Sequence, residues 1–103
     1  MGADIYVVVG DIGSAKEVLP AIQKLPESVT VQWFVDDDPK AKAGTDVLQK
    51  ASVSYETRGP LAEDTTKVIV VGTSATAAGA QIAWTQFGID HDIPVVWVED
   101  LWG

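Results

Sequence analysis

Short runs of β-branched and aromatic residues with almost no polar alternation constrain the fold of this chain most strongly. They occur at Ile5–Val9 (IYVVV), Val29–Val35 (VTVQWFV), Lys67–Val71 (KVIVV) and Ile93–Val98 (IPVVWV). A strand with one face in water alternates apolar and polar residues, whereas a strand buried on both faces is apolar throughout. These runs therefore predict buried strands of a parallel sheet, and Val53–Thr57 predicts a further, shorter strand.

Helix signals lie between the predicted strands. Ser14–Glu17 (SAKE) has the form of a capping box and opens a helix that Pro26 ends. A weaker helix is predicted over Pro39–Ala51. Ser74–Phe87 is the clearest helix, and Gly88 is placed to be its C-cap.

Strands that alternate with helices favour a parallel sheet with helices on both faces. Right-handed crossovers leave few strand orders. We expect a single three-layer α/β domain over residues 1–103, Rossmann-like with strand order 3-2-1-4-5; the flavodoxin-like order 2-1-3-4-5 is the alternative. Leu61–Lys67 leaves room for one or two helical turns. The residues that we expect to be buried in the sheet are Val7, Val9, Phe34, Val70 and Val96.

Composition excludes several classes of function. The net charge is -8, with only seven Lys and Arg among 103 residues, which argues against a nucleic-acid binder. No apolar run approaches the roughly 18–20 residues that a membrane span needs. The chain has no cysteine, so disulfides and thiolate chemistry are excluded, and a cytoplasmic location fits.

The predicted sheet also predicts where a ligand binds. In such folds ligands lie outside the carboxyl ends of the strands, near the point where the strand order reverses, which here is between strands 1 and 4. Small and polar residues follow the strands at these ends. The candidate ligand-binding residues are Gly10, Gly13, Ser14, Asp36, Gly72, Thr73, Ser74, Thr76 and Asp100.

Two interpretations of the segment Gly72–Thr76 (GTSAT) stay open. Backbone N–H groups and hydroxyls at a strand-to-helix turn suit a phosphate. Alternatively, Ser74 only caps the helix, and the small residues that follow let the helix pack close to the sheet. The segment is not a P-loop, because no lysine follows the glycine.

Gly10-Asp11-Ile12-Gly13 resembles half of a dinucleotide fingerprint, with Asp36 in the usual place of a ribose-binding acid. However, Ile12 stands where a second glycine is needed, and Asp11 would repel a diphosphate. We therefore expect no nicotinamide site, and no motif identifies a cofactor.

The remaining polar and aromatic residues that could form a functional site are better explained by structural roles. Asp36–Asp38 could hold Mg²⁺, but a solvated turn explains it better, and no metal site is predicted. His91 lies between two aspartates without a partner nucleophile nearby in the sequence. We expect Trp33 and Trp97 in the core, whereas exposure of Trp84 or Trp102 would indicate an interface.

The segment from Lys67 onward resembles the N-terminal Rossmann-like domains of two-domain glycosyltransferases and related sugar-nucleotide enzymes. The features that carry the resemblance are the strand ending Val-Gly-Thr-Ser, then Gly88, Ile93-Pro94 and the final Asp-Leu-Trp-Gly. The resemblance covers about a third of the chain. It implies a phosphate or nucleotide-sugar ligand, bound mostly by a C-terminal domain that this chain lacks.

Two functions follow as expectations. In the first, the chain is the N-terminal domain of a nucleotide-sugar or phosphate-handling enzyme and is not catalytic in isolation. Its end at Trp102-Gly103, just after the last predicted strand, suggests a fragment of a longer protein. In the second, the chain is a non-catalytic module for protein contact or self-association, which the absence of any nucleophile–base pair favours.

Overall fold

The computed structural model describes residues 3–10, 12–35, 46, 48–72 and 79–98, with the backbone alone over 12–17. Five parallel strands form one sheet in the order β3-β2-β1-β4-β5. They are β1 (Ile5–Val9), β2 (Val31–Val35), β3 (Tyr55–Glu56), β4 (Val68–Gly72) and β5 (Val95–Val98). The domain is therefore an α/β, Rossmann-like sheet, and the predicted order 3-2-1-4-5 is confirmed against 2-1-3-4-5.

The central strand β1 fixes the register of the sheet. Ile5–Val9 pairs residue by residue with Val31–Val35 on one side, and Ile5–Val8 pairs with Val68–Val71 on the other. Both neighbours of β1 are thus parallel to it, which explains why its sequence is apolar on both faces.

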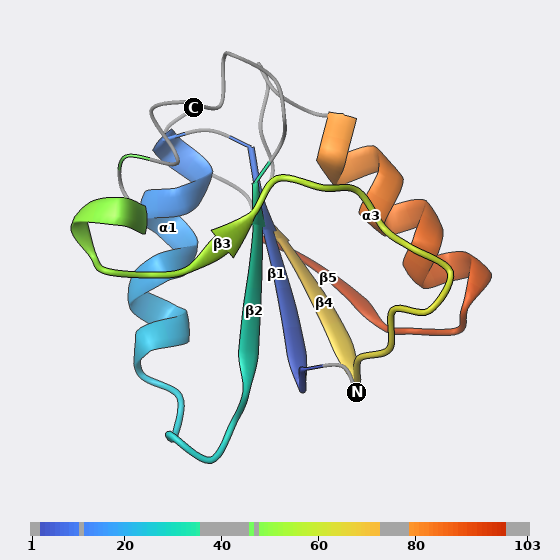
Figure 1. Ribbon diagram of the computed structural model, residues 1–103, viewed down its shortest axis with the longest axis horizontal. Coiled ribbons are helices and arrows are strands. Elements are labelled where there is room, and N and C mark those ends of the chain that lie inside the picture. Colours follow the sequence, from blue (N-terminus) through green and yellow to red (C-terminus); the bar gives the residue numbers. More distant parts are fainter. Residues whose placement is uncertain (1–2, 11, 36–45, 47, 73–78, 99–103) are drawn as a thin grey trace.

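Helices cover the two faces of the sheet. Figure 1 shows α1 (Ile12–Gln23) on one side of the strands and α3 (Gly79–Asp90) on the other. The predicted three layers are therefore present. On the α1 face the buried core residues are Val7, Val9, Val18, Trp33, Val35 and Leu48.

The α3 face is buried by a cluster of aromatic side chains. The Trp84 ring lies 4.3 Å from the Phe34 ring, 5.5 Å from the Tyr6 ring and 5.7 Å from the Phe87 ring, measured between centroids. Trp84 and Phe34 are fully buried. Two of these three contacts are edge-on, an arrangement that ring quadrupoles favour.

The helix boundaries differ from the sequence-based predictions. Helix α1 begins at Ile12, so Ser14 lies within its first turn and is not the N-cap. Helix α3 continues to Asp90, so Gly88 lies inside the helix and the C-cap prediction is wrong. Residues 46 and 48–50 are helical, in agreement with the end of the weaker predicted helix. The predicted starts of this helix and of the helix from Ser74 lie outside the described residues.

Burial agrees with the prediction in the middle of the sheet and departs from it at the edge. Val7, Val9 and Phe34 are buried, as predicted, whereas Val70 is half-buried. The predictions for Val96 and Trp97 are wrong, because these side chains are 49% and 52% exposed on the edge strand β5.

No helix connects β3 to β4. The connection, residues 57–67, contains only a short turn in which the Asp64 N–H donates to the Leu61 carbonyl at 3.0 Å. The room that Leu61–Lys67 leaves for one or two helical turns is thus taken by a single hydrogen-bonded turn. Figure 1 shows this segment crossing from β3 to the α3 side of the sheet.

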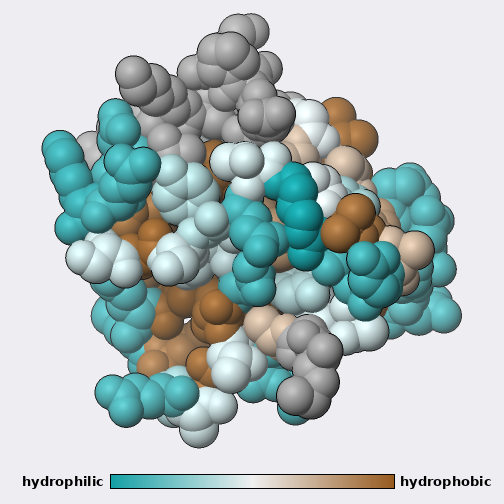
Figure 2. Space-filling model, viewed as in Figure 1, coloured by the Kyte–Doolittle hydropathy of each residue, from teal (hydrophilic) through white to brown (hydrophobic). Residues whose placement is uncertain are grey.

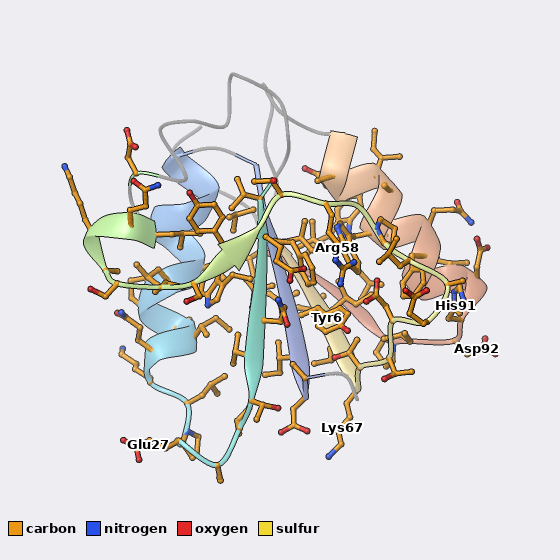
Figure 3. The ribbon with its side chains drawn as sticks, in the orientation of Figure 1. Tyr6, Glu27, Arg58, Lys67, His91 and Asp92 are labelled. Carbon is orange, nitrogen blue, oxygen red and sulfur yellow. The ribbon has the colours of Figure 1, made fainter. Side chains whose placement is uncertain are left out.

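Arg58 and Asp64 hold the connection against the aromatic cluster. The Arg58 guanidinium lies 4.9 Å from the Phe34 ring centroid and 5.9 Å from that of Trp84, within range of a cation–π interaction. Its Nη1 and Nη2 donate to the two Asp64 carboxylate oxygens at 2.8 and 2.9 Å. Figure 3 shows Arg58 and Tyr6 side by side on this face. A bidentate ion pair thus takes the place of a crossover helix.

Candidate functional site

The glycines that follow β1 and β4 lie at the same edge of the sheet. Val8 pairs with Val71, so the chain leaves both strands together, through Gly10 and Gly72. Both glycines are buried. This edge is the carboxyl end of the two strands between which the strand order reverses, where α/β sheets of this kind bind ligands.

Two further predicted residues lie next to this edge. Gly13 and Ser14 belong to the first turn of α1, which starts two residues after Gly10. Backbone N–H groups in the first turn of a helix have no intrahelical acceptor, and the helix dipole adds a partial positive charge. The other predicted residues, which are Asp36, Thr73, Ser74, Thr76 and Asp100, lie outside the described residues.

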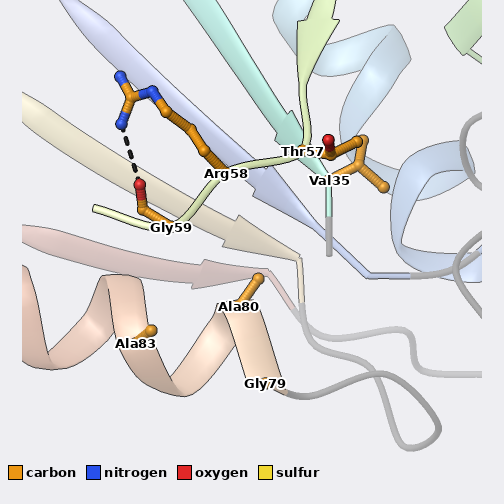
Figure 4. Close-up of a pocket in the computed structure, with 7 residues that line it drawn as sticks. All are labelled: Val35, Thr57, Arg58, Gly59, Gly79, Ala80 and Ala83. Atoms are coloured by element: carbon orange, nitrogen blue, oxygen red, sulfur yellow. Dashed lines mark hydrogen bonds between the residues drawn. The ribbon is translucent and has the colours of Figure 1, made fainter. Parts of the chain in front are cut away.

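A pocket of about 210 Å³ opens at the same end of the sheet (Figure 4). It lies between the ends of β2 and β3 and the start of α3. Val35, which lines it, pairs with Val9, the residue before Gly10. The residues that line the pocket are Val35, Thr57, Arg58, Gly59, Gly79, Ala80 and Ala83.

This pocket was not predicted from the sequence. One wall is the connection that replaces a crossover helix, and no sequence pattern predicted that arrangement. The opposite wall consists of the small residues of α3, namely Gly79, Ala80 and Ala83. The small size of these residues was the only feature of the sequence that could have indicated the pocket, because small side chains leave room beside a helix.

Small and largely apolar side chains line the pocket, and Arg58, the one cation among its described lining residues, is already paired. Arg58 Nε donates to Glu56 Oε2 at 2.8 Å, and Nη1 donates to the Gly59 carbonyl at 2.9 Å. With the two bonds to Asp64, one positive charge is held by two carboxylates. The pocket therefore suits an uncharged ring better than a phosphate, and in this pocket Arg58 is not available to bind one.

Asp64 is the buried member of this network. Its carboxylate also accepts the Leu61 N–H at 2.6 Å and the Tyr6 hydroxyl at 3.4 Å. Burial alone raises the pKa of Asp64, but the hydrogen bonds from Arg58 and Leu61 outweigh it and hold this pKa below its usual value. Burial and the neighbouring carboxylate raise the pKa of the Tyr6 hydroxyl.

The lowered pKa of Asp64 predicts a stability that depends on pH. A carboxyl group with a depressed folded-state pKa stabilises the fold above its unfolded pKa of about 3.9, and this stabilisation is lost as pH falls through the folded pKa. Asp64→Asn should therefore reduce the free energy of unfolding by about 1 kcal/mol at pH 7. The difference from the wild type should shrink as the pH falls from about 5 towards 2.

Urea unfolding at a series of pH values measures this difference. Glu63→Gln, at the exposed neighbouring position, is the control and should follow the wild type throughout. A difference between Asp64→Asn and the wild type that does not change with pH would rule out the charge of Asp64 as its source.

His91 has a structural role in the described part of the chain. Its ring stacks on Phe87 at a centroid distance of 4.1 Å, and its Nδ1 lies 2.9 Å from the Phe87 carbonyl. Among the described residues, no three His, Cys, Asp or Glu side chains gather as metal ligands. No helix in the described ranges is long and apolar enough to cross a membrane.

Comparison with known proteins assigns no family. No protein-family model matches the chain, and no curated protein or solved structure matches it significantly. The parallel α/β sheet and the geometry at its carboxyl edge are therefore the basis for any functional argument.

Proposed function

We propose that this chain is an N-terminal α/β domain of a nucleotide-sugar or phosphate-handling enzyme of the glycosyltransferase type, and that it binds part of the ligand. The observation that carries the proposal is that Gly10 and Gly72 follow paired residues of the neighbouring strands β1 and β4 at the carboxyl edge, one strand away from the pocket beside Val35. Backbone N–H groups of the segments after these glycines bind the phosphate. The pocket receives an uncharged part of the ligand, such as a base or a sugar ring.

Backbone N–H groups supply the anion binding in this proposal. The segments concerned are the first turn of α1 at Gly13 and Ser14 and Gly72–Thr76. Because Arg58 is paired with Asp64 and Glu56, and the chain carries a net charge of -8, affinity for the phosphate is weak and falls with added salt. The domain binds without turning substrate over, and the catalytic groups belong to another part of the enzyme.

Uridine diphosphate and inorganic phosphate are suitable probes, followed by isothermal titration calorimetry at low salt. Ala83→Leu fills the pocket without breaking α3, because leucine is a good helix former. We expect it to weaken binding of uridine diphosphate about tenfold, a loss of about 1.4 kcal/mol, and to leave phosphate binding unchanged.

The matched control is Ala21→Leu, the same change at an exposed position of α1. It should bind both probes as the wild type does. Equal weakening by the two variants, or no heat of binding at millimolar uridine diphosphate, would contradict the proposal.

The alternative function, a module for self-association, is favoured by a different observation. The exposed edge strand β5 carries Val96 and Trp97, and both side chains are about half exposed. This surface is independent of the pocket, so one protein can have both properties.

A further inference from the structure

Strand β5 lies at one edge of the sheet that the described strands form. It pairs with β4 on one side, and no described strand lies on its other side. Val96 and Trp97 project to opposite faces and are 49% and 52% exposed. Two large exposed apolar side chains thus lie on a strand at the edge of the described sheet.

The backbone of β5 presents regularly spaced groups at this edge. The Ile69 N–H donates to the Pro94 carbonyl at 2.9 Å, so residue 94, and with it residue 96, directs its backbone towards β4. Because these directions alternate along a strand, the N–H and C=O groups of Val95 and Trp97 point outward. Pro94, which has no N–H, removes no donor from this edge.

The opposite edge of the described sheet is shorter and charged, whereas β5 is longer and carries no charge. Strand β3 has only two residues, and Glu56 in it forms an ion pair with Arg58 at 2.8 Å. Short length and charge are the means by which edge strands avoid pairing with other chains. Strand β5 has the sequence VVWV, which contains no charge.

We propose that β5 pairs antiparallel with β5 of a second copy of this chain, about a two-fold axis at Val96. Val95 then lies opposite Trp97 of the second copy, and each of these pairs exchanges two backbone hydrogen bonds. The two Val96 residues face each other at the close, non-hydrogen-bonded position between them. The outward groups at residues 95 and 97 make the strand complementary to itself, which is the requirement for a two-fold interface.

Helix α3 extends the same surface. The two-fold axis is perpendicular to the sheet, so α3 of both copies lies on one face of the joined sheet. Ile82 and Ile89 are 66% and 63% exposed and lie two helical turns apart. Between them, Thr85 accepts a hydrogen bond from Trp97 Nε1 at 3.1 Å, which places this stripe beside β5. Figure 2 shows hydrophobic residues reaching the surface on the α3 side of the molecule.

The size and charge of this surface fit a weak dimer of the chain with itself. Its four exposed side chains offer on the order of 300–400 Å² per copy, about half of the roughly 800 Å² that a partner buries in a standard interface. With a net charge of -8 per copy, two copies repel each other except where an uncharged surface meets its equivalent. Added salt therefore strengthens the dimer, whereas it weakens phosphate binding.

Sedimentation equilibrium over a wide range of protein concentration tests this interface. We expect a reversible monomer–dimer equilibrium between about 10 μM and 1 mM for the wild type, the range for a small interface. Val96→Lys should be monomeric throughout, because it places two like charges opposite each other. Leu25→Lys, at another exposed position, should dimerise as the wild type does.

Amide hydrogen exchange provides a second measurement that needs no variant. Raising the protein concentration should slow exchange at Val95 and Trp97, whose N–H groups become bonded in the dimer. A monomer at every concentration would overturn the proposal. So would a dimer that survives Val96→Lys, or protection that appears only away from β5.

Discussion

Trp84→Ala should reduce the free energy of unfolding by about 3–5 kcal/mol, the cost of removing a large aromatic side chain from a packed core. Trp84 is fully buried and touches the rings of Tyr6, Phe34 and Phe87. Its indole N–H has no hydrogen-bond partner in the described part of the chain, so its contribution comes from apolar and ring contacts. Arg58, which lies over the same rings, would also lose a cation–π partner.

Trp97→Ala is the matched control for this prediction. It makes the same chemical change at a side chain that is 52% exposed. In dilute protein, where the chain is monomeric, we expect it to cost less than about 1 kcal/mol. Urea unfolding of the two variants gives both values. A larger loss for Trp97→Ala than for Trp84→Ala would contradict the described packing of α3 on the sheet.

Gly88→Ala should reduce the free energy of unfolding by about 2 kcal/mol, although alanine is the better helix former. A Cβ at this position would overlap Val95 Cγ2 and would lie 3.1 Å from the Ile93 carbonyl oxygen and 3.3 Å from Ile69 Cδ1. The valine side chain is stiff and the carbonyl belongs to the backbone, so moving either group away from the added Cβ costs free energy. This steric cost exceeds the gain of up to about 1 kcal/mol in helix propensity.

Gly59→Ala serves as the control for this steric argument. A Cβ on Gly59 meets no atom within 4 Å, so the variant should unfold within about 0.5 kcal/mol of the wild type. Thermal or urea unfolding of both variants decides the question. Stabilisation by Gly88→Ala would mean that α3 lies farther from β5 than the structure places it.

The sheet could be predicted from the sequence because the pattern that indicates each strand lies within a few consecutive residues. Unbroken apolar runs such as Ile5–Val9 identify strands buried on both faces, and handedness rules limit how they connect. The edge positions were not predictable in the same way. Val96 and Trp97 have the same β-branched and aromatic character as core residues, and only the place of β5 in the sheet exposes them.

Long-range packing explains the other differences. Gly88 resembles a C-cap in the sequence, yet its role is to let α3 approach Val95, a contact that no local pattern reveals. Arg58 and Asp64 are six residues apart in a polar stretch, and their pairing over the Phe34 ring depends on the path of the connection across the sheet. The pocket beside that connection could not be predicted either, because it also depends on the path of the connection.

An amide NMR titration tests whether the carboxyl edge of the sheet binds a phosphate-bearing ligand, as we propose. Uridine diphosphate is added at low salt to ¹⁵N-labelled protein, dilute enough to remain monomeric. We expect saturable shifts at Gly13, Gly72, Thr73, Ser74 and Ala83 that weaken as salt is added. If these five amides stay unchanged at millimolar ligand, or only amides elsewhere respond, the proposal is wrong and the small residues at this edge serve packing alone.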